Sequence, residues 1–201
     1  MKRDLIPHLC WLSKPVIFRY SDAPARLTWE SLMAISLYDV SIPALTRGLT
    51  NMSAILDKAA TYATAKKVDQ TVLAQTRLFP DMHPLSRQVQ IACDTAKGAA
   101  GRLAGIEIPK HADNETTLAE LRARIAKTLD FLNTVTAAKV AGDESRAIEI
   151  KFPNGAWKFT ALSYVNDFVL PNFYFHTSMV YALLRKSGVE IGKGDFLGAI
   201  Q

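Results

Sequence analysis

A polar pair interrupts the apolar stretch LPNFYFHTSMVYALL at residues 170–184. Asn172 and His176 are four residues apart, so a helix would place both side chains on one face, a single turn from each other. Phe173 and Val180 fall on the same face, which directs the imidazole of His176 toward an interior. A buried imidazole has to be neutral or hydrogen-bonded. The spacing therefore predicts either a polar site or two core polar groups that have partners.

A second polar stripe runs along residues 84–103, opposite a stripe of alanines. Solvent exposure explains this stripe most simply, but Gln90 or Asp94 would turn inward if the helix were covered on two sides. We therefore expect a pocket in which His176 acts as general base or sole imidazole contact and Asp94 orients it. The candidate substrate-binding residues are Gln90, Asn172 and Phe173.

Metal catalysis needs about three protein ligands, and the sequence contains no HxxxH or HExxH pair. Asn172 stands where a histidine would be a good ligand, and a neutral carboxamide binds zinc or nickel poorly. We therefore predict no cofactor; if a divalent metal is bound, His176 and Asp94 are the candidate ligands. Motifs for a serine elbow, a phosphate loop and a dinucleotide site are absent as well.

The formal net charge of +5 invites a nucleic-acid interpretation. However, the lysines and arginines are scattered, and the longest basic runs are pairs such as Lys66-Lys67. Nucleic-acid recognition usually needs a concentrated basic face, so we expect no such partner. No apolar run approaches the roughly 20 residues of a membrane span. Two cysteines are too few for a disulfide framework, which favours a cytoplasmic location.

Residues 1–32 do not share the pattern of the rest of the chain, because they contain three prolines and show no sustained period. The codons for Trp29 and Glu30 must read TGGGAR, a purine-rich stretch that resembles a bacterial ribosome-binding site shortly before Met33. We therefore expect that 1–32 is an over-called translation start, with a poorly ordered arm as the alternative. The domain proper is predicted to span 33–201.

Apolar and small residues recur at spacings of three and four through most of this domain, which predicts amphipathic helices. Pro171 should kink the last of them, and Pro43 should either kink the first or make it start later. Arg122, Arg124 and Lys127 lie off the apolar stripe of their helix, so we expect them to face solvent. The predicted helices cover about 37–66, 84–103, 117–135 and 160–187.

Between the third and fourth helices, the stretch 148–159 alternates apolar and polar residues on either side of Asn154-Gly155, which predicts a β-hairpin. Its aromatic face should pack on the helices, because an isolated hairpin is marginally stable. The prediction is an all-α protein with one small hairpin: a four-helix bundle. The long link after the second helix favours a crossover, with the second and third helices parallel.

The sequence also resembles a known family in five stretches. The family is the bacterial domain-of-unknown-function family nineteen ninety-three, which is similar in turn to the DinB/YfiT-like superfamily. The resemblance covers about residues 34–198. The stretches are ISLYDVSIPALTRGLTNMSAILDKA, LFPDMHPLSRQVQIACDTAKGAAGRLAG, ETTLAELRARIAKTLDFL, KFPNGAWKFTALSYV and LPNFYFHTSMVYALLRKSGVEIGKGDFLG.

This resemblance implies a DinB-like four-helix bundle with a crossover between helices 2 and 3, often as a homodimer. In the DinB-like pattern, one histidine comes from the second helix and an HxxxH pair comes from the fourth. The fourth-helix positions correspond to Asn172 and His176, and the second-helix position falls within 90–94, where this sequence has no histidine.

Three functions stay open at this point. The first is a small-molecule-binding protein or enzyme that uses a pocket near Asp94, Asn172 and His176. The second is a non-catalytic homodimeric interaction protein, with Tyr174 and Tyr181 as interface anchors. The third is a divalent-metal-dependent transferase or hydrolase of the DinB/YfiT type, as the resemblance implies for some relatives.

Overall fold

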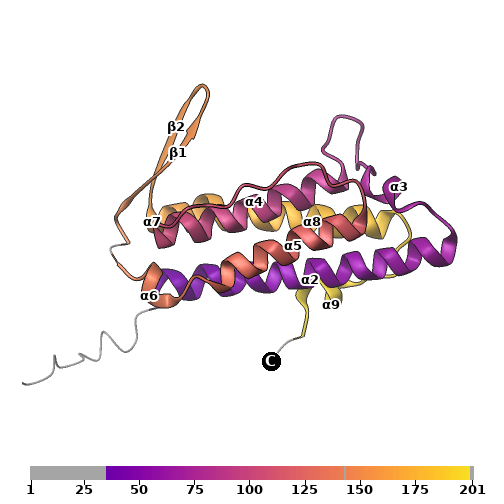
Figure 1. Ribbon diagram of the computed structural model, residues 1–201, viewed down its shortest axis with the longest axis horizontal. Coiled ribbons are helices and arrows are strands. Elements are labelled where there is room, and N and C mark those ends of the chain that lie inside the picture. The colour runs from indigo at the N-terminus through magenta and orange to yellow at the C-terminus, as the bar shows by residue number, and fades with distance from the viewer. Residues whose placement is uncertain (1–34, 143, 200–201) are drawn as a thin grey trace, which may run out of the picture. The chain divides into compact units, whose positions relative to one another are not determined.

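Four long helices pack around one hydrophobic core (Figure 1). In the computed structural model, which describes residues 35–142 and 144–199, α2 packs against α5 and α8, and α4 packs against the same two helices. The mainly helical fold with one small antiparallel sheet is therefore as predicted. The long helices are α2 (Leu37–Lys66), α4 (Leu85–Ala104), α5 (Leu118–Asn133) and α8 (Leu170–Lys186).

The predicted extension at residues 1–32 lies outside the described residues, so it stays a prediction. Short elements join the long helices or follow them. They are α3 (Gln70–Ala74), α6 (Ala137–Val140), β1 (Ala147–Phe152), β2 (Gly155–Thr160), α7 (Ala161–Ser163), the π-helical turn η1 (Tyr164–Val169) and α9 (Lys193–Leu197).

The connection between α4 and α5 is a crossover, as predicted. In Figure 1, α4 and α5 both run from right to left, and the chain between them returns along α4 to start α5 at the far end. The connection packs tightly at Gly101, where an added Cβ would clash with the Ile108 side chain. This crossover, residues 105–117, covers a face of α4 that would otherwise meet solvent.

Local sequence signals set the ends of the helices. Ser36 accepts from the N–H of Asp39 while the Asp39 carboxylate accepts from the N–H of Ser36, a capping box that starts α2. The predicted capping box of Thr117 and Glu120 likewise starts α5. α4 ends at Gly105, whose φ of +65° is the left-handed conformation that glycine adopts readily.

The hairpin forms with a turn one residue earlier than predicted. Phe152 pairs with Gly155, so Pro153 and Asn154 are the loop residues. At its base, Phe159 lies 5.8 Å from the ring of Tyr164, which packs this end on the fourth helix as expected. Farther out, the Trp157 ring is 53% exposed but still packs edge-on against Phe168 of η1 at 5.7 Å, and the end of the hairpin beyond it projects away from the bundle (Figure 1).

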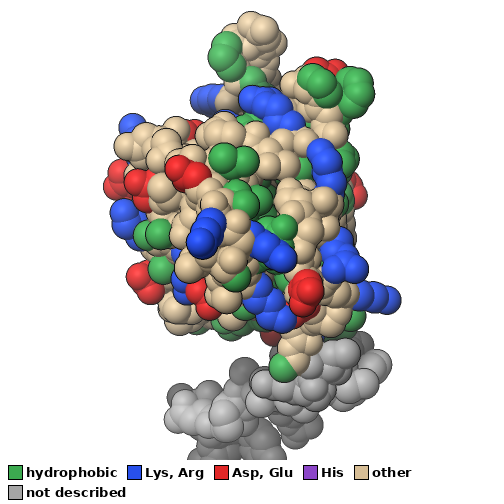
Figure 2. All heavy atoms as spheres, turned by 90° about the vertical axis from the view of Figure 1, so that its right-hand side faces the viewer, with side chains coloured by type: hydrophobic (Ala, Val, Ile, Leu, Met, Phe, Trp, Pro, Cys, Tyr) green, Lys and Arg blue, Asp and Glu red, His purple; other side chains and the backbone are tan. Residues whose placement is uncertain are grey.

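The surface of the described residues mixes both charge signs. Seen from the right-hand side of the bundle, lysine and arginine side chains are interspersed with acidic and uncharged ones (Figure 2). Among the helices of residues 35–142 and 144–199, none combines the length and apolar character needed to cross a membrane.

Candidate functional site

The fourth long helix changes its hydrogen-bonding pattern just before the predicted polar pair. The turn η1 has π-helical geometry, and α8 begins one residue before Pro171. Because proline has no N–H, Pro171 cannot donate to the carbonyl of Asp167. The structure places a widened turn where the sequence predicted a kink. Such turns occur frequently at functional sites, which draws attention to the residues that follow.

His176 faces the interior, as predicted, with 8% of its surface exposed. Its Nδ1 lies 2.6 Å from Oε1 of Gln88, and the Gln88 amide donates to the carbonyl of His83 at 3.3 Å. Because a carboxamide oxygen only accepts, Nδ1 carries the proton of the neutral ring. Burial, helped by the side chains of His83 and Arg87, lowers the pKa of His176 to about 4. The imidazole is therefore neutral at pH 7.

Asn172 lies one turn earlier and also bonds to α4. Its Nδ2 donates to Oγ1 of Thr95 at 2.7 Å, and that hydroxyl donates to the carbonyl of Ile91 at 2.8 Å. Two side-chain hydrogen bonds thus link α8 to α4: Asn172 pairs with Thr95, and His176 pairs with Gln88. Neither partner belonged to the predicted set. Their spacing of seven, two helical turns on one face, is the signal that would have found them.

The structure does not bring Asp94 to His176. The Asp94 carboxylate binds Nη2 of Arg124 at 2.7 Å and Nζ of Lys97 at 2.9 Å, so Gln88 holds the imidazole instead. Gln90 donates to Glu115 at 2.9 Å, also away from α8. The reason is the orientation of α4 about its own axis. Successive side chains are turned by about 100°, so the face that carries Gln90 and Asp94 points at α5 and the crossover.

Arg124 was expected to face solvent, and this expectation is wrong. The residue is 3% exposed, because the crossover covers it. Its guanidinium meets Asp94, Asp113 at 3.0 Å and Glu115 at 3.0 Å. Position 124 is three residues after Leu121, which belongs to the apolar stripe of α5. This spacing could have indicated that Arg124 is buried. This network fastens the crossover to α4 and α5.

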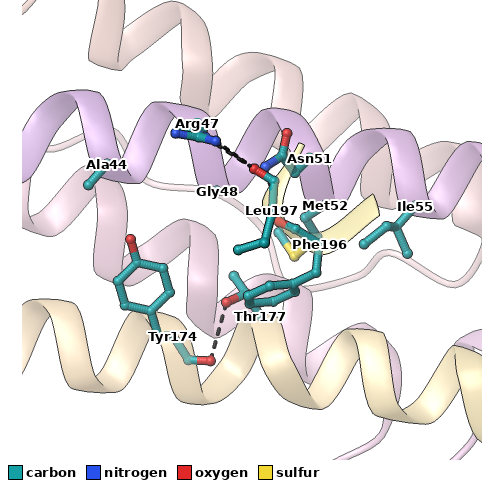
Figure 3. Close-up of a pocket in the computed structure, with 10 residues that line it drawn as sticks. All are labelled: Ala44, Arg47, Gly48, Asn51, Met52, Ile55, Tyr174, Thr177, Phe196 and Leu197. Carbon is teal, nitrogen blue, oxygen red and sulfur yellow. Dashed lines mark hydrogen bonds between the residues drawn. The ribbon is translucent and has the colours of Figure 1, made fainter. Parts of the chain in front are cut away.

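A cavity of about 200 Å³ lies elsewhere, between α2, α8 and α9 (Figure 3). Its lining is largely apolar, and the thioether of Met52 points into it in the figure. The hydroxyl of Thr177 donates to the carbonyl of Tyr174 at 3.3 Å at the α8 wall. The lining residues are Ala44, Arg47, Gly48, Asn51, Met52, Ile55, Tyr174, Thr177, Phe196 and Leu197.

Phe173, predicted to bind substrate, lies behind this cavity and not in it. The ring is fully buried, and a Cβ added to Gly48 would meet it at 2.5 Å. Gly48 therefore allows α2 and α8 to approach closely next to the cavity. Phe173 belongs to the core that shapes the wall.

The C-terminal segment 193–199 closes one side of the cavity. Arg47 donates to the carbonyl of Leu197 at 2.9 Å and to that of Ala199 at 3.2 Å, and Asn51 donates to that of Phe196 at 3.1 Å. These bonds are polar and lie near the surface, and no residue of α9 is buried. The segment is thus held as a cover over an apolar hollow.

The two predicted interface tyrosines differ in environment. Tyr174 is 42% exposed at the rim of the cavity. The ring of Tyr181 packs edge-on against Phe196 of α9 at 6.0 Å, so this chain already covers part of it.

The residues at the positions that correspond to DinB-like ligands do not fit a divalent transition metal. Asn172 supplies a carboxamide whose amide is bonded to Thr95, and His176 has its Nδ1 bonded to Gln88. Within residues 35–142 and 144–199, no three His, Cys, Asp or Glu side chains are grouped closely enough to hold an ion. The α4–α8 interface therefore offers one free imidazole nitrogen among neutral amides and hydroxyls.

Comparison with known proteins identifies relatives of the chain. Residues 37–197 match the model of a domain of unknown function, DUF1993. A crystal structure of a DinB family member protein from Shewanella denitrificans is 45% identical in sequence. The similarity covers 82% of this chain and 93% of that chain, with a TM-score of 0.75. None of the curated proteins matches.

Proposed function

Since the chain belongs to the DUF1993 family, a domain of unknown function, we propose its function from its own geometry: it binds a small molecule in the cavity between α2, α8 and α9. The observation that carries this proposal is a lined hollow of about 200 Å³ beneath a C-terminal cover that polar bonds hold and that buries no residue of α9. Ligand sites are typically concave, mostly apolar and equipped with a few polar groups. This cavity has that composition (Figure 3).

The size of the cavity suggests the size of the ligand. An apolar protein cavity of about 150 Å³ accepts benzene. A cavity of about 200 Å³ therefore suits an aromatic ring or a branched aliphatic group with one small substituent. Met52 and Ile55, both buried, supply apolar contacts for such a group.

The charge at the cavity edge suggests the substituent. Arg47 bonds to backbone carbonyls, which do not neutralise its guanidinium, and it makes no ion pair within the described part of the chain. Arginine recognises carboxylates well because its planar donors match the two oxygens. The ligand class we propose is therefore a small carboxylic acid with an apolar body.

Methionine-methyl NMR tests this proposal, with phenylacetate as the probe. The Met52 methyl should shift saturably, while the methyls of Met82 and Met179, which do not line the cavity, should not. Ala44→Trp fills the hollow and should weaken binding at least about tenfold, the change that about 1.4 kcal/mol produces. The matched control Ala54→Trp lies on the exposed side of α2 and should bind like the wild type.

Two outcomes would contradict the proposal. One is the absence of any Met52 shift at millimolar phenylacetate. The other is equal binding by the two tryptophan variants when both retain the helical circular dichroism of the wild type.

Two other functions remain predictions. His176 as a general base is supported by its inward, neutral imidazole, but its partner is Gln88, and the ring does not line the cavity. A metal-dependent transferase or hydrolase is disfavoured by the amide and hydroxyl groups at the α4–α8 interface.

Self-association is a second candidate property, favoured by one observation. Tyr174 and Phe175, adjacent on α8, are 42% and 55% exposed, and aromatic side chains are enriched at interfaces. We propose a homodimer that uses this face. Sedimentation at micromolar concentration should give a dimer for the wild type and a monomer for Phe175→Lys, and a monomeric wild type would contradict it.

The cytoplasmic location remains a prediction from the cysteine content.

A further inference from the structure

A second hollow, of about 380 Å³, lies where the crossover meets α5. It shares no lining residue with the cavity between α2, α8 and α9. Most of its polar lining is charged or titratable, in contrast to the apolar walls of that cavity. These side chains are Lys110, His111 and Glu115 from the crossover, and Glu120, Arg124 and Lys127 from α5.

Two nitrogen atoms of this lining are buried and have no hydrogen-bond partner. They are Nε of Arg124 and Nδ1 of His111. The Arg124 side chain is 2% exposed, and its carboxylate contacts all go through Nη1 and Nη2. Buried polar atoms in folded proteins almost always have partners, so an unpaired Arg124 N–H donor and an unpaired imidazole nitrogen at one hollow call for a hydrogen-bonding group from outside the chain.

Some charged side chains around the hollow have partners in the chain, and others do not. Glu115 accepts from Arg124 at 3.0 Å, and Glu120 accepts from the N–H of Thr117 at 2.9 Å in the capping box of α5. Glu115 is therefore ion-paired, whereas the bonds of Glu120 orient its carboxylate and leave its negative charge in place. Lys110 and Lys127 make no ion pair within residues 35–142 and 144–199. Among the described side chains that line the hollow, the two lysines therefore outnumber the one unpaired carboxylate, that of Glu120, and the unpaired charge is positive on balance.

The imidazole of His111 responds to this positive surrounding. Burial lowers the pKa of His111, and the nearby cations of Lys97, Arg124 and Lys127 lower it further, while Asp94 opposes them. The ring is thus neutral at pH 7, and a neutral imidazole can donate one hydrogen bond to an acceptor.

We propose that this hollow binds a small oxyanion, a phosphate or a phosphoryl group, between Lys110 and Lys127 at the rim and His111 and Arg124 at the base. Such an anion has enough oxygen acceptors to serve several donors at once. A bound anion would offset the positive charge of Lys110 and Lys127, and its hydrogen bonds would connect the crossover to α5. No covalent step is implied.

The test is a titration of the full chain with inorganic phosphate at constant ionic strength, followed by histidine ¹H–¹⁵N NMR. The ring signals of His111 should shift saturably, while those of His83 and His176 should stay in place. Lys110→Ala and Lys127→Ala should each weaken binding about threefold, and the double variant about tenfold, as expected for partly exposed charges. Lys158→Ala, on the exposed hairpin strand β2, is the matched control.

A second titration with glycerol 3-phosphate separates the two possible sources of the anion. Binding at least tenfold tighter than that of phosphate indicates a phosphorylated metabolite, and equal binding indicates the free ion. The proposal is overturned if His111 does not shift with either probe. It is also overturned if the double lysine variant and Lys158→Ala bind equally.

Discussion

Acid should weaken the fold through His176, whose imidazole is buried in the neutral form. In the folded chain its pKa is about 4, because burial disfavours the charged ring. In the unfolded chain a histidine has a pKa of about 6.5. Between these values the unfolded state binds the proton and the folded state does not. The stabilisation is therefore complete above pH 6.5 and is lost as the pH falls toward 4.

The two pKa values set the size of the effect. The gap between 6.5 and about 4 corresponds to a total loss of about 3 kcal/mol of unfolding free energy once the pH is below both values. At pH 5 the unfolded histidine is almost fully protonated and the folded one is about one-tenth protonated. The expected loss at pH 5, relative to pH 7.5, is therefore about 2 kcal/mol.

Urea unfolding at pH 7.5 and pH 5.0 measures this loss in the wild type and in His176→Gln. The variant retains an amide that can donate to Gln88, but it has no group that titrates. His111, whose pKa is also lowered, contributes in both proteins and cancels from the comparison. His83→Gln removes one of the charges that lower the pKa of His176, so its loss of stability should lie between those of the wild type and His176→Gln.

The expected result is that the wild type loses about 2 kcal/mol more than His176→Gln between the two pH values. If the two proteins lose the same amount, His176 is not held neutral in the folded state.

Two further predictions concern packing and charge. Gly48→Ala should lower stability by about 1–3 kcal/mol, measured by thermal unfolding, because the new methyl group would meet the Phe173 ring at 2.5 Å. Gly194→Ala, which has no atom within 4 Å of an added Cβ, should be tolerated, and equal losses would contradict the packing argument. Arg124→Met leaves Glu115 without an ion pair, while Asp94 keeps Lys97 and Asp113 keeps Arg87, so it should cost about 1–3 kcal/mol in urea unfolding, and no measurable loss would mean that the network contributes little.

The helical elements were predictable because their signals are local. The capping residues Ser36 and Thr117 bond to atoms three positions ahead, and apolar spacing along one helix needs no knowledge of its neighbours. The hairpin was predictable for the same reason, since a turn depends on its own few residues. The loop lies at Pro153-Asn154, one residue before the predicted position, so such local signals place a turn to within about one residue.

The pairing of polar residues was not predictable in the same way. Asn172 and His176 were identified and their inward direction was correct, but their partners Thr95 and Gln88 lie far away in the chain. Asp94 was chosen as a carboxylate that could orient an imidazole. Only the rotation of α4 about its own axis shows that Asp94 faces α5. When a helix carries polar residues on two faces, its sequence does not determine which face points at which neighbour.

The sequence by itself determined the four long helices, their approximate ends, and that residue 176 faces an interior, but not the short helices α3, α6 and α9 or the π-helical turn η1. These properties follow from short-range periodicity and hydrogen bonds between near neighbours. The tertiary structure alone decided that the crossover buries Arg124 and that the C-terminal segment covers the hollow between α2 and α8. Both depend on contacts between residues far apart in the chain, and their energy depends on which surfaces meet, which local patterns do not encode.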